Sequence, residues 1–323
     1  MMVRINMVNE HRSTKNKTRH TKMLILGAGP AGLSAALYAA RADLEPIVLS
    51  GLQLGGQASL TNIIENYPGF PDGVGGMELG ELFHKQAERF GAHLEYDSAR
   101  SVDLTSQPLK VTSDAGEFST DALILATGAS PNQLNIPGES AMTGKGVSYC
   151  ATCDGWFFKE KNVVVVGGGD SALEESLFLT RFASSISVIH RRDTLRAGAI
   201  LQKRAMAEPK IKYIWNTVVT EVIGADRVES LKVRQLQTNK ESIFPADGLF
   251  IFIGHTPNTQ MFSGQLKMNK GYIKVDRKMH TSVPGVFAAG EAADPYFRQV
   301  VTSAGMGAMA AMEAIHFLEK MER

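Results

Sequence analysis

The sequence predicts an α/β protein of two parallel-sheet domains, with the second domain inserted into the first. An apolar strand, a glycine-rich turn, a helical segment and a second strand follow one another from Met23, and the same order returns from Asn162. Strands that alternate with helices indicate βαβ units, and a repeated unit indicates two such domains. After the second unit, the apolar strands Gly248–Gly254 and Val286–Gly290 lead to a helical stretch, Ser303–Leu318, which we expect to complete the first domain.

The composition is that of a soluble globular protein. Of 323 residues, 44% are hydrophobic and 21% are charged, and the formal net charge is +1. This balance gives no electrostatic reason to expect nucleic acid or a charged membrane surface as a partner. No apolar run approaches the roughly 20 residues of a membrane span. Two cysteines cannot form the disulfide framework of a secreted protein, so we expect a cytoplasmic protein.

Residues 1–20 differ from the rest of the chain. They carry five basic side chains against one acidic side chain, and they lack the apolar core of 7–15 residues that a secretory signal needs. We interpret them as a solvated, disordered tail or an over-long gene start. An organelle transit peptide, which is also basic and poor in acids, is the alternative.

The first glycine turn has the pattern of a dinucleotide-binding site. Gly27, Gly29 and Gly32 form G-x-G-x-x-G between a strand and a helix, with Pro30 and Ala31 inside the motif. The first glycine makes the turn, the second lets the backbone approach a pyrophosphate, and the third lets helix and strand pack closely. The phosphates would lie at the helix N-terminus. The alternative is a purely structural glycine turn.

One element of the usual motif is missing from this first unit. An acidic residue is expected about 20 positions further on, where it binds the ribose hydroxyls. Ser50 and Gly51 stand there instead. We therefore expect the first domain to bind its dinucleotide without that carboxylate.

The second glycine turn is the variant with alanine at the close-packing position. It comprises Gly167, Gly169 and Ala172, with Asp170 and Ser171 between the last two. This pattern again predicts a dinucleotide at the start of a helix.

Basic residues replace the acidic residue in the second unit. His190, Arg191 and Arg192 end its second strand, and Arg196 follows. A carboxylate at this place would accept a hydrogen bond from the 2′-hydroxyl of NAD, whereas guanidinium groups pair with a 2′-phosphate. The second domain is therefore predicted to bind NADPH. A solvated basic face is the alternative interpretation.

Both cysteines lie in one C-x-x-C motif, Cys150 to Cys153. A zinc site would need two more ligands, and the eight histidines show no metal-binding spacing, so we expect no metal. A redox dithiol fits better, because one thiolate can attack a disulfide while its partner resolves the mixed disulfide. Asp154 is placed to give a proton to a leaving thiolate, although a helix or turn cap is an equal alternative.

Nicotinamide delivers two electrons as a hydride, and a flavin couples this transfer to a disulfide. The first domain is therefore predicted to bind FAD. The expected layout is a tail at 1–20, the first part of the FAD domain at 21–130, the NADPH domain with the dithiol at 131–256, and the second part of the FAD domain at 257–323.

These motifs together resemble bacterial-type, low-molecular-weight thioredoxin reductases, from about residue 20 to the end of the chain. Besides the two glycine turns and the dithiol, the matching strings are Gly55–Gln57, Glu65–Gly69, Ala126–Ala129, His190–Asp193, Ile253–Asn258, Val286–Gly290 and Arg298–Gln299. The resemblance implies a homodimeric enzyme that passes electrons from NADPH through FAD to the disulfide of thioredoxin. It also implies that the NADPH domain rotates about the connections near 126–130 and 254–258.

The resemblance also implies roles for single residues. Cys153 corresponds to the thiol next to the flavin, Cys150 to the thiol that attacks thioredoxin, and Asp154 to the general acid. Further FAD-binding positions by the matching motifs are Gly56, Gln57, Asn66, Thr127, Gly128, Gly290, Glu291, Arg298 and Gln299. Glu291 departs from the family, which usually has an aspartate there.

Other flavoproteins share parts of this pattern. Peroxiredoxin reductases of the alkyl hydroperoxide type carry additional thioredoxin-like domains, which 20 residues cannot hold. Dithiol oxidases lose the NADPH-binding arginines, and flavodoxin or ferredoxin reductases of similar layout lack the dithiol. A non-catalytic flavoprotein sensor would have little need for both cysteines.

Overall fold

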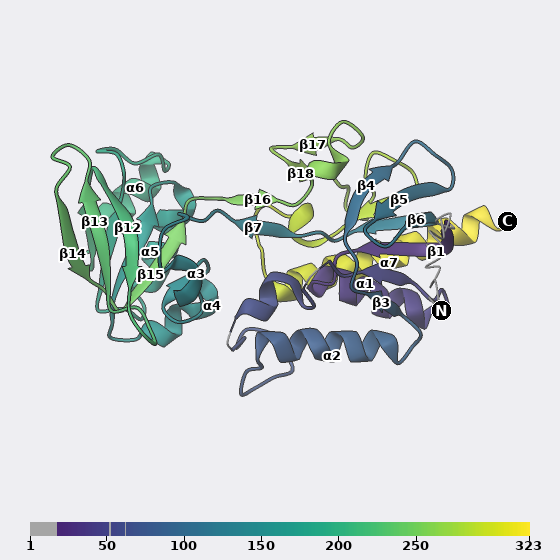
Figure 1. The fold of residues 1–323 in the computed structure, drawn as a ribbon, viewed down its shortest axis with the longest axis horizontal. Coiled ribbons are helices and arrows are strands. Elements are labelled where there is room, and N and C mark those ends of the chain that lie inside the picture. The colour runs from purple at the N-terminus through teal and green to yellow at the C-terminus, as the bar shows by residue number, and fades with distance from the viewer. Residues whose placement is uncertain (1–17, 52, 62) are drawn as a thin grey trace, which may run out of the picture.

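The computed structural model describes residues 18–51, 53–61 and 63–323, and it consists of two bodies joined by a pair of extended strands (Figure 1). The first 17 positions of the predicted tail lie outside the described residues. Strand β1 begins at Arg19, inside the segment predicted to be tail, because Arg19 and His20 pair with Phe118 and Ser119 of β6.

The first body contains a mixed sheet with the strand order β3-β2-β1-β6-β5-β4. Its strands are β1 (Arg19–Leu26), β2 (Ile47–Leu49), β3 (His93–Glu95), β4 (Ala99–Asp103), β5 (Leu109–Ser113), β6 (Glu117–Leu125) and β19 (Val286–Ala288). Strand β6 pairs parallel with β1 along its length, but on its other edge the partner changes: the first half pairs antiparallel with β5, and the second half pairs parallel with β19. The sheet of this body is therefore completed by a segment from the far end of the chain.

Two helices with small residues pack closely on this sheet. Helix α1 (Pro30–Arg41) and helix α7 (Val300–Met321) bury alanines against each other, and α2 (Gly76–Glu88) lies beside α1 (Figure 1). A Cβ atom on Gly307 would lie 2.0 Å from the carbonyl oxygen of Ala31. The approach of α7 to α1 therefore requires a glycine at this position.

The second body has a parallel sheet with the strand order β11-β10-β9-β15-β8. Its strands are β8 (Val147–Ser148), β9 (Asn162–Gly167), β10 (Ser185–Ile189), β11 (Ile211–Ile214) and β15 (Gly248–Phe252). Helices α5 (Asp170–Leu179) and α6 (Ala199–Met206) share one apolar core with this sheet. An antiparallel sheet of β12 (Thr217–Ile223), β13 (Ser230–Gln235) and β14 (Glu241–Pro245) shares a second core with it.

The two bodies are connected by β7 (Ala129–Pro131) and β16 (His255–Pro257), which pair antiparallel with each other. Asn258 strengthens the pair: its side chain accepts a hydrogen bond from Ser130 Oγ at 3.2 Å and donates one to the Thr127 carbonyl at 3.0 Å. The second body is thus an insertion in the first, and the predicted fold class is confirmed. The domain boundaries expected from the sequence fall within this strand pair.

The remaining elements are short. They are α3 (Glu139–Met142), α4 (Ala151–Asp154), β17 (Met268–Asn269), β18 (Tyr272–Ile273) and the 3₁₀ turns Gly56–Leu60, Gly155–Phe158, Gln260–Phe262 and Gly290–Ala292. Within the described residues, no helix combines the length and apolar character needed to cross a bilayer.

Candidate active site

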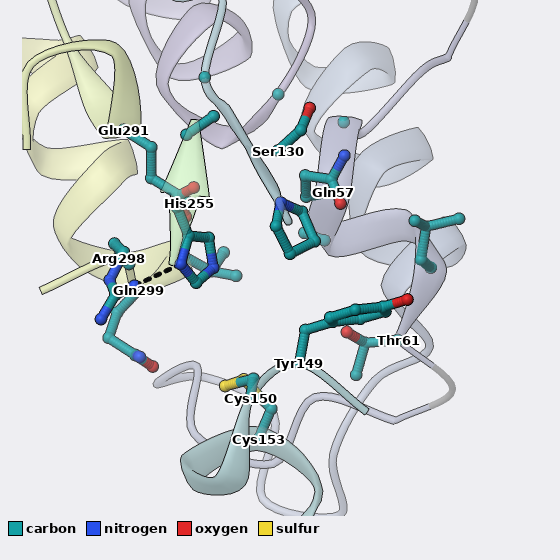
Figure 2. Close-up of a pocket in the computed structure, with 18 of the residues that line it drawn as sticks. Gln57, Thr61, Ser130, Tyr149, Cys150, Cys153, His255, Glu291, Arg298 and Gln299 are labelled. Carbon is teal, nitrogen blue, oxygen red and sulfur yellow. Dashed lines mark hydrogen bonds between the residues drawn. A yellow bond between two sulfur atoms is a disulfide. The ribbon is translucent and has the colours of Figure 1, made fainter. Parts of the chain in front are cut away.

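A cavity of about 1420 Å³ lies between the two bodies. It is lined by the first glycine turn, the two connecting strands and the C-x-x-C segment (Figure 2). A pocket for one drug-sized ligand has roughly 300–1,000 Å³, so this cavity has room for a ligand as large as a dinucleotide.

The first glycine turn is shaped as a phosphate cradle. A Cβ atom on Gly27 would lie 2.3 Å from the Ala126 carbonyl oxygen, and one on Gly32 would lie 1.8 Å from the Gly27 carbonyl oxygen. The same atom on Gly29, at the N-terminus of α1, would have only the Gly56 Cα at 4.0 Å. The third glycine therefore serves packing alone, the first packs closely and also lines the cavity, and the second, with Pro30 and Ala31, faces the cavity with open space around it.

Every further FAD-binding position expected from the resemblance lines this cavity. Asn66 Nδ2 donates to Gln299 Oε1 at 3.1 Å, which links two of these positions across the first body. Burial raises the pKa of Glu291 to about 7, and the charge of Arg298 only partly opposes this. This set of polar groups around a large cavity fits the predicted FAD.

His255 is a residue of the site that the sequence-based list of site residues did not include. Arg298 Nη1 donates to its Nδ1 at 2.6 Å, so strand β16 is bonded to the segment just before α7 (Figure 2). Burial, together with the charge of Arg298, lowers the pKa of His255 to about 4. His255 is therefore neutral at physiological pH, and its place in the matching string Ile253–Asn258 could have indicated it.

Cys150 and Cys153 form a disulfide with a Cα–Cα distance of 5.4 Å. Cys150 immediately precedes α4 and Cys153 lies within it, and both line the cavity (Figure 2). The Sγ atom of Cys150 lies 3.3 Å from the Thr152 hydroxyl. The disulfide and the first glycine turn therefore face the same space from different bodies.

Asp154 lies on the cavity wall beside the disulfide. Burial raises the pKa of its carboxyl group, and a 2.6 Å hydrogen bond from Ser148 Oγ opposes this only in part. Its side chain makes no capping hydrogen bond at α4 or at the following 3₁₀ turn, so the capping role considered from the sequence finds no support in the structure. A carboxyl group that holds its proton more firmly is suited to act as a general acid.

The second glycine turn has the same division of roles as the first. A Cβ atom on Gly167 would lie 2.6 Å from the Cβ atom of Ala172, whereas one on Gly169, at the N-terminus of α5, would meet nothing within 4 Å. Asp170 turns away from this open space, because its Oδ1 accepts a 2.7 Å hydrogen bond from the backbone N–H of Gly198.

Basic side chains border this second turn. The ring of His190 is 5% exposed and lies directly over Gly168, and its Nε2 has no hydrogen-bond partner among the described residues. Burial lowers the pKa of His190. Arg191, Arg192 and Arg196 are exposed, and none forms an ion pair within the described chain. The backbone N–H of Arg196 donates to the Gly168 carbonyl at 2.7 Å, which places the segment of these arginines against the second turn, as expected for NADPH.

The structure does not bring this second turn to the cavity. Of the predicted NADPH-binding residues, all of which are described, Ser171 alone lines it. The described residues also contain no cluster of side chains suited to a metal ion.

A cavity shared by a glycine cradle and a disulfide, with a second dinucleotide turn on the disulfide's own domain, defines a disulfide oxidoreductase with two dinucleotide sites.

Comparisons with known proteins agree with this class. Residues 21–307 match the family of pyridine nucleotide-disulphide oxidoreductases. A thioredoxin reductase of Streptomyces coelicolor is 48% identical over 300 residues, which cover 92% of this chain and 93% of that protein. One of Escherichia coli O157:H7 is 46% identical over 313 residues, covering 94% and 97%.

Solved structures show the same relationship. The thioredoxin reductase of Streptococcus pyogenes superposes with a TM-score of 0.89 at 39% identity, and the match covers 94% of this chain and 100% of that one. That of Lactococcus lactis, described as the FR conformation, has a TM-score of 0.64 at 39% identity, covering 93% and 99%. The chain belongs to the pyridine nucleotide-disulphide oxidoreductases, among the thioredoxin reductases. This membership implies FAD and NADPH as cofactors and confirms both predictions.

Proposed function

We propose that this enzyme transfers electrons from NADPH through FAD to the Cys150–Cys153 disulfide and from there to the disulfide of thioredoxin. One observation carries the proposal: the disulfide faces the cavity of the first glycine turn, while the arginines suited to a 2′-phosphate lie on the same domain as the disulfide. The thioredoxin reductases of S. coelicolor and E. coli support thioredoxin as the substrate.

The chain's own groups account for the second half of the reaction. FAD, when bound, supplies the ability to accept a hydride from NADPH and to pass two electrons to a disulfide. Once reduced, Cys150 attacks the disulfide of thioredoxin and forms a mixed disulfide, and one thioredoxin sulfur leaves. Cys153 then attacks Cys150 Sγ, which releases the second thioredoxin sulfur and restores the Cys150–Cys153 bond. Asp154 supplies a proton to a leaving thiolate.

Exposed aromatic side chains beside the dithiol support a protein substrate. Trp156 and Phe157 lie in the 3₁₀ turn Gly155–Phe158 that follows α4, and they are 56% and 41% exposed. Their rings meet edge to face, with centroids 5.9 Å apart. Large aromatic groups on a surface next to a reactive centre are typical of protein–protein contacts.

We include rotation of the second domain in the proposal. In the present arrangement the disulfide reaches the cavity and the second glycine turn does not, so a nicotinamide held by that turn needs another orientation to reach the flavin. The two solved structures at 39% identity and nearly equal coverage have TM-scores of 0.89 and 0.64. Such a difference at equal sequence similarity supports a change in the arrangement of the domains.

A homodimer and a cytoplasmic location complete the proposal. Exposed apolar side chains on α7, Val301, Met309 and Met312, offer a surface for a second copy of the chain. A cysteine pair used for redox exchange fits a reducing compartment. Light scattering of the purified protein would show a dimer mass, and a monomer mass would contradict this part.

The central experiment follows the flavin absorbance. NADPH added anaerobically should bleach the yellow protein, and oxidised thioredoxin should restore the colour. Cys153→Ser should keep FAD bound but lose thioredoxin reduction. A protein that NADPH bleaches but thioredoxin does not reoxidise would rule out thioredoxin as the substrate.

A further inference from the structure

A second carboxyl group lines the cavity of the redox cysteines with one oxygen atom buried, and the electron transfer proposed above does not use it. Glu175 belongs to α5, and its side chain lines the same cavity as Cys150 and Cys153. Its Oε2 atom is buried without a hydrogen-bond partner among the described residues. Buried polar groups are nearly always paired, so an unpaired carboxylate oxygen calls for an explanation.

This carboxyl group faces the first residues of the dithiol helix. Helix α4 packs directly on α5. Burial raises the pKa of Glu175, whereas the charge of Arg298 and the backbone N–H groups of Ala151 and Thr152 lower it. The carboxyl group therefore competes with a cysteine thiolate for the N–H groups that follow Cys150 in the chain.

Besides those two N–H groups, Arg298 is the one group that favours the charged form of Glu175. Arg298 belongs to the first body and interacts with Glu175 through its charge. Its guanidinium group donates its 2.6 Å hydrogen bond to His255. Glu174, its neighbour on α5, adds a like charge, whereas Asp154 of α4, which lines the same cavity, has a pKa raised by its own burial.

We propose that Glu175 sets the reducing power of the Cys150–Cys153 dithiol by opposing thiolate formation. Backbone N–H groups and positive charges favour a thiolate, and a carboxylate among them disfavours it. When the disulfide accepts two electrons, the S–S bond breaks and each sulfur becomes a thiolate or, with a proton from solvent, a thiol. A nearby negative charge destabilises the thiolate but neither the disulfide nor the thiol.

The consequence for function follows from thiol–disulfide equilibrium. A pair whose reduced form is stabilised is a stronger oxidant, so a pair whose thiolate is destabilised is a stronger reductant. Glu175 therefore favours the transfer of electrons from this dithiol onward. This inference rests on the proposed redox role of the disulfide and adds a residue that adjusts it.

The test compares Glu175→Gln with two other variants. Glu174→Gln removes a charge from the adjacent, exposed position, and Glu175→Asp keeps the charge. The FAD-loaded enzymes are equilibrated anaerobically with mixtures of reduced and oxidised dithiothreitol at pH 5.5 and pH 8. Free thiols are then counted by alkylation and mass spectrometry, and flavin absorbance in the same samples corrects for electrons held on FAD.

At pH 8, the equilibrium ratio of dithiol to disulfide should be on the order of three- to tenfold higher in Glu175→Gln than in the wild type, since one unit of thiol pKa is a factor of ten. At pH 5.5 the difference should shrink, because a protonated thiol carries no charge for Glu175 to oppose. Glu174→Gln and Glu175→Asp should stay near the wild type at both values.

An unchanged ratio at pH 8 would overturn the inference. An equal change at both pH values would also overturn it, because that result indicates a structural effect on α4. Neither NADPH nor thioredoxin enters this measurement, so its failure would leave the proposed function standing.

Discussion

At the scale of single residues, burial decides which groups of the site carry charge. It raises the pKa of Asp154 and Glu291, so these acids hold their protons more firmly. It lowers the pKa of His190 and His255, so these imidazoles remain neutral near pH 7. Positive charge at both proposed dinucleotide sites is therefore expected to come from arginines, which stay ionised at any physiological pH.

Glu291 should make the stability of the FAD-free protein depend on pH. Its folded pKa of about 7 lies above the ordinary value of 4.5, so its contribution is fully present below pH 4.5 and is lost as the pH rises through 7. Glu291→Gln should therefore be more stable than the wild type at pH 8, by on the order of 3 kcal/mol. Urea unfolding at pH 4 should show no difference between them.

The exposed Glu319→Gln on α7 serves as the control, with equal stability to the wild type at both pH values. If the stability difference between Glu291→Gln and the wild type did not vary with pH, the raised pKa of Glu291 would be contradicted.

The arginines after β10 should determine the choice of nicotinamide cofactor. Arg191→Ala with Arg192→Ala removes two guanidinium groups, and hydrogen bonds to charged groups contribute about 1.5–3 kcal/mol each. We expect the KM for NADPH to rise on the order of tenfold or more, with the KM for NADH nearly unchanged. Steady-state kinetics with both cofactors measure this ratio.

Arg181→Ala is a matched control, because Arg181 is exposed on the same domain and lies over the Phe178 ring instead. An unchanged preference for NADPH in the double variant would remove the assignment of the 2′-phosphate site.

At the scale of elements, the contact between α1 and α7 fixes the first glycine turn. Gly29 and Ala31 open α1, and Gly307 brings α7 against the Ala31 carbonyl. Gly290 packs on the same residue, since a Cβ atom there would lie 2.9 Å from the Ala31 Cβ. A change in this helix contact is therefore expected to shift the backbone of the first glycine turn and so to weaken FAD binding.

Two glycines of α7 provide a matched pair for testing this. Gly307→Ala should destabilise the protein by about 1–3 kcal/mol, because overpacking forces the backbones apart, and it should weaken FAD binding. At Gly305 a Cβ atom would meet nothing within 4 Å. Gly305→Ala should be stabilising by up to about 1 kcal/mol through helix propensity. Thermal unfolding and FAD titration distinguish them, and equal effects at both positions would refute the packing argument.

At the scale of the whole molecule, the two bodies touch through few side chains near the cavity. Gln299 Nε2 lies 3.4 Å from Thr152 Oγ1, across the domain boundary. A contact of this length adds little stability, which suits an arrangement that must change during turnover.

A covalent link at this contact should separate the two half-reactions. Thr152→Lys with Gln299→Glu, joined by a zero-length amide crosslink, would hold the disulfide at the flavin cavity. Stopped-flow reduction by NADPH should slow at least about tenfold if rotation gates it, while electrons placed on the flavin by dithionite should still reach the disulfide. The uncrosslinked double variant is the control. Unimpaired reduction by NADPH in the crosslinked protein would exclude the rotation.

The sequence could predict those features that depend on neighbouring residues. The glycine turns at Gly27 and Gly167, the strands that precede them and the connection near Asn258 all follow from local pattern. The partner change along β6 and the antiparallel sheet β12–β14 were not predicted, because strand pairing depends on tertiary contacts that no local pattern encodes.

The same distinction holds for the site. Cys150, Asp154 and the three arginines stand in recognisable motifs, whereas Glu175 lies in an ordinary helical stretch and gains its place only when α5 packs on α4. The side chain of Asp170 lies in a glycine motif, yet the structure directs it to Gly198. A motif identifies a residue, but its orientation depends on neighbours that are distant in the chain.

The completion of β6 by β19 has a consequence for how the protein is made. A ribosome that has released the chain through β16 has already delivered the entire inserted body. The first body at that moment still lacks β19 beside β6 and α7 beside α1. Domains generally fold as units during synthesis, so the body that starts the chain is expected to finish folding last, after the body translated inside it.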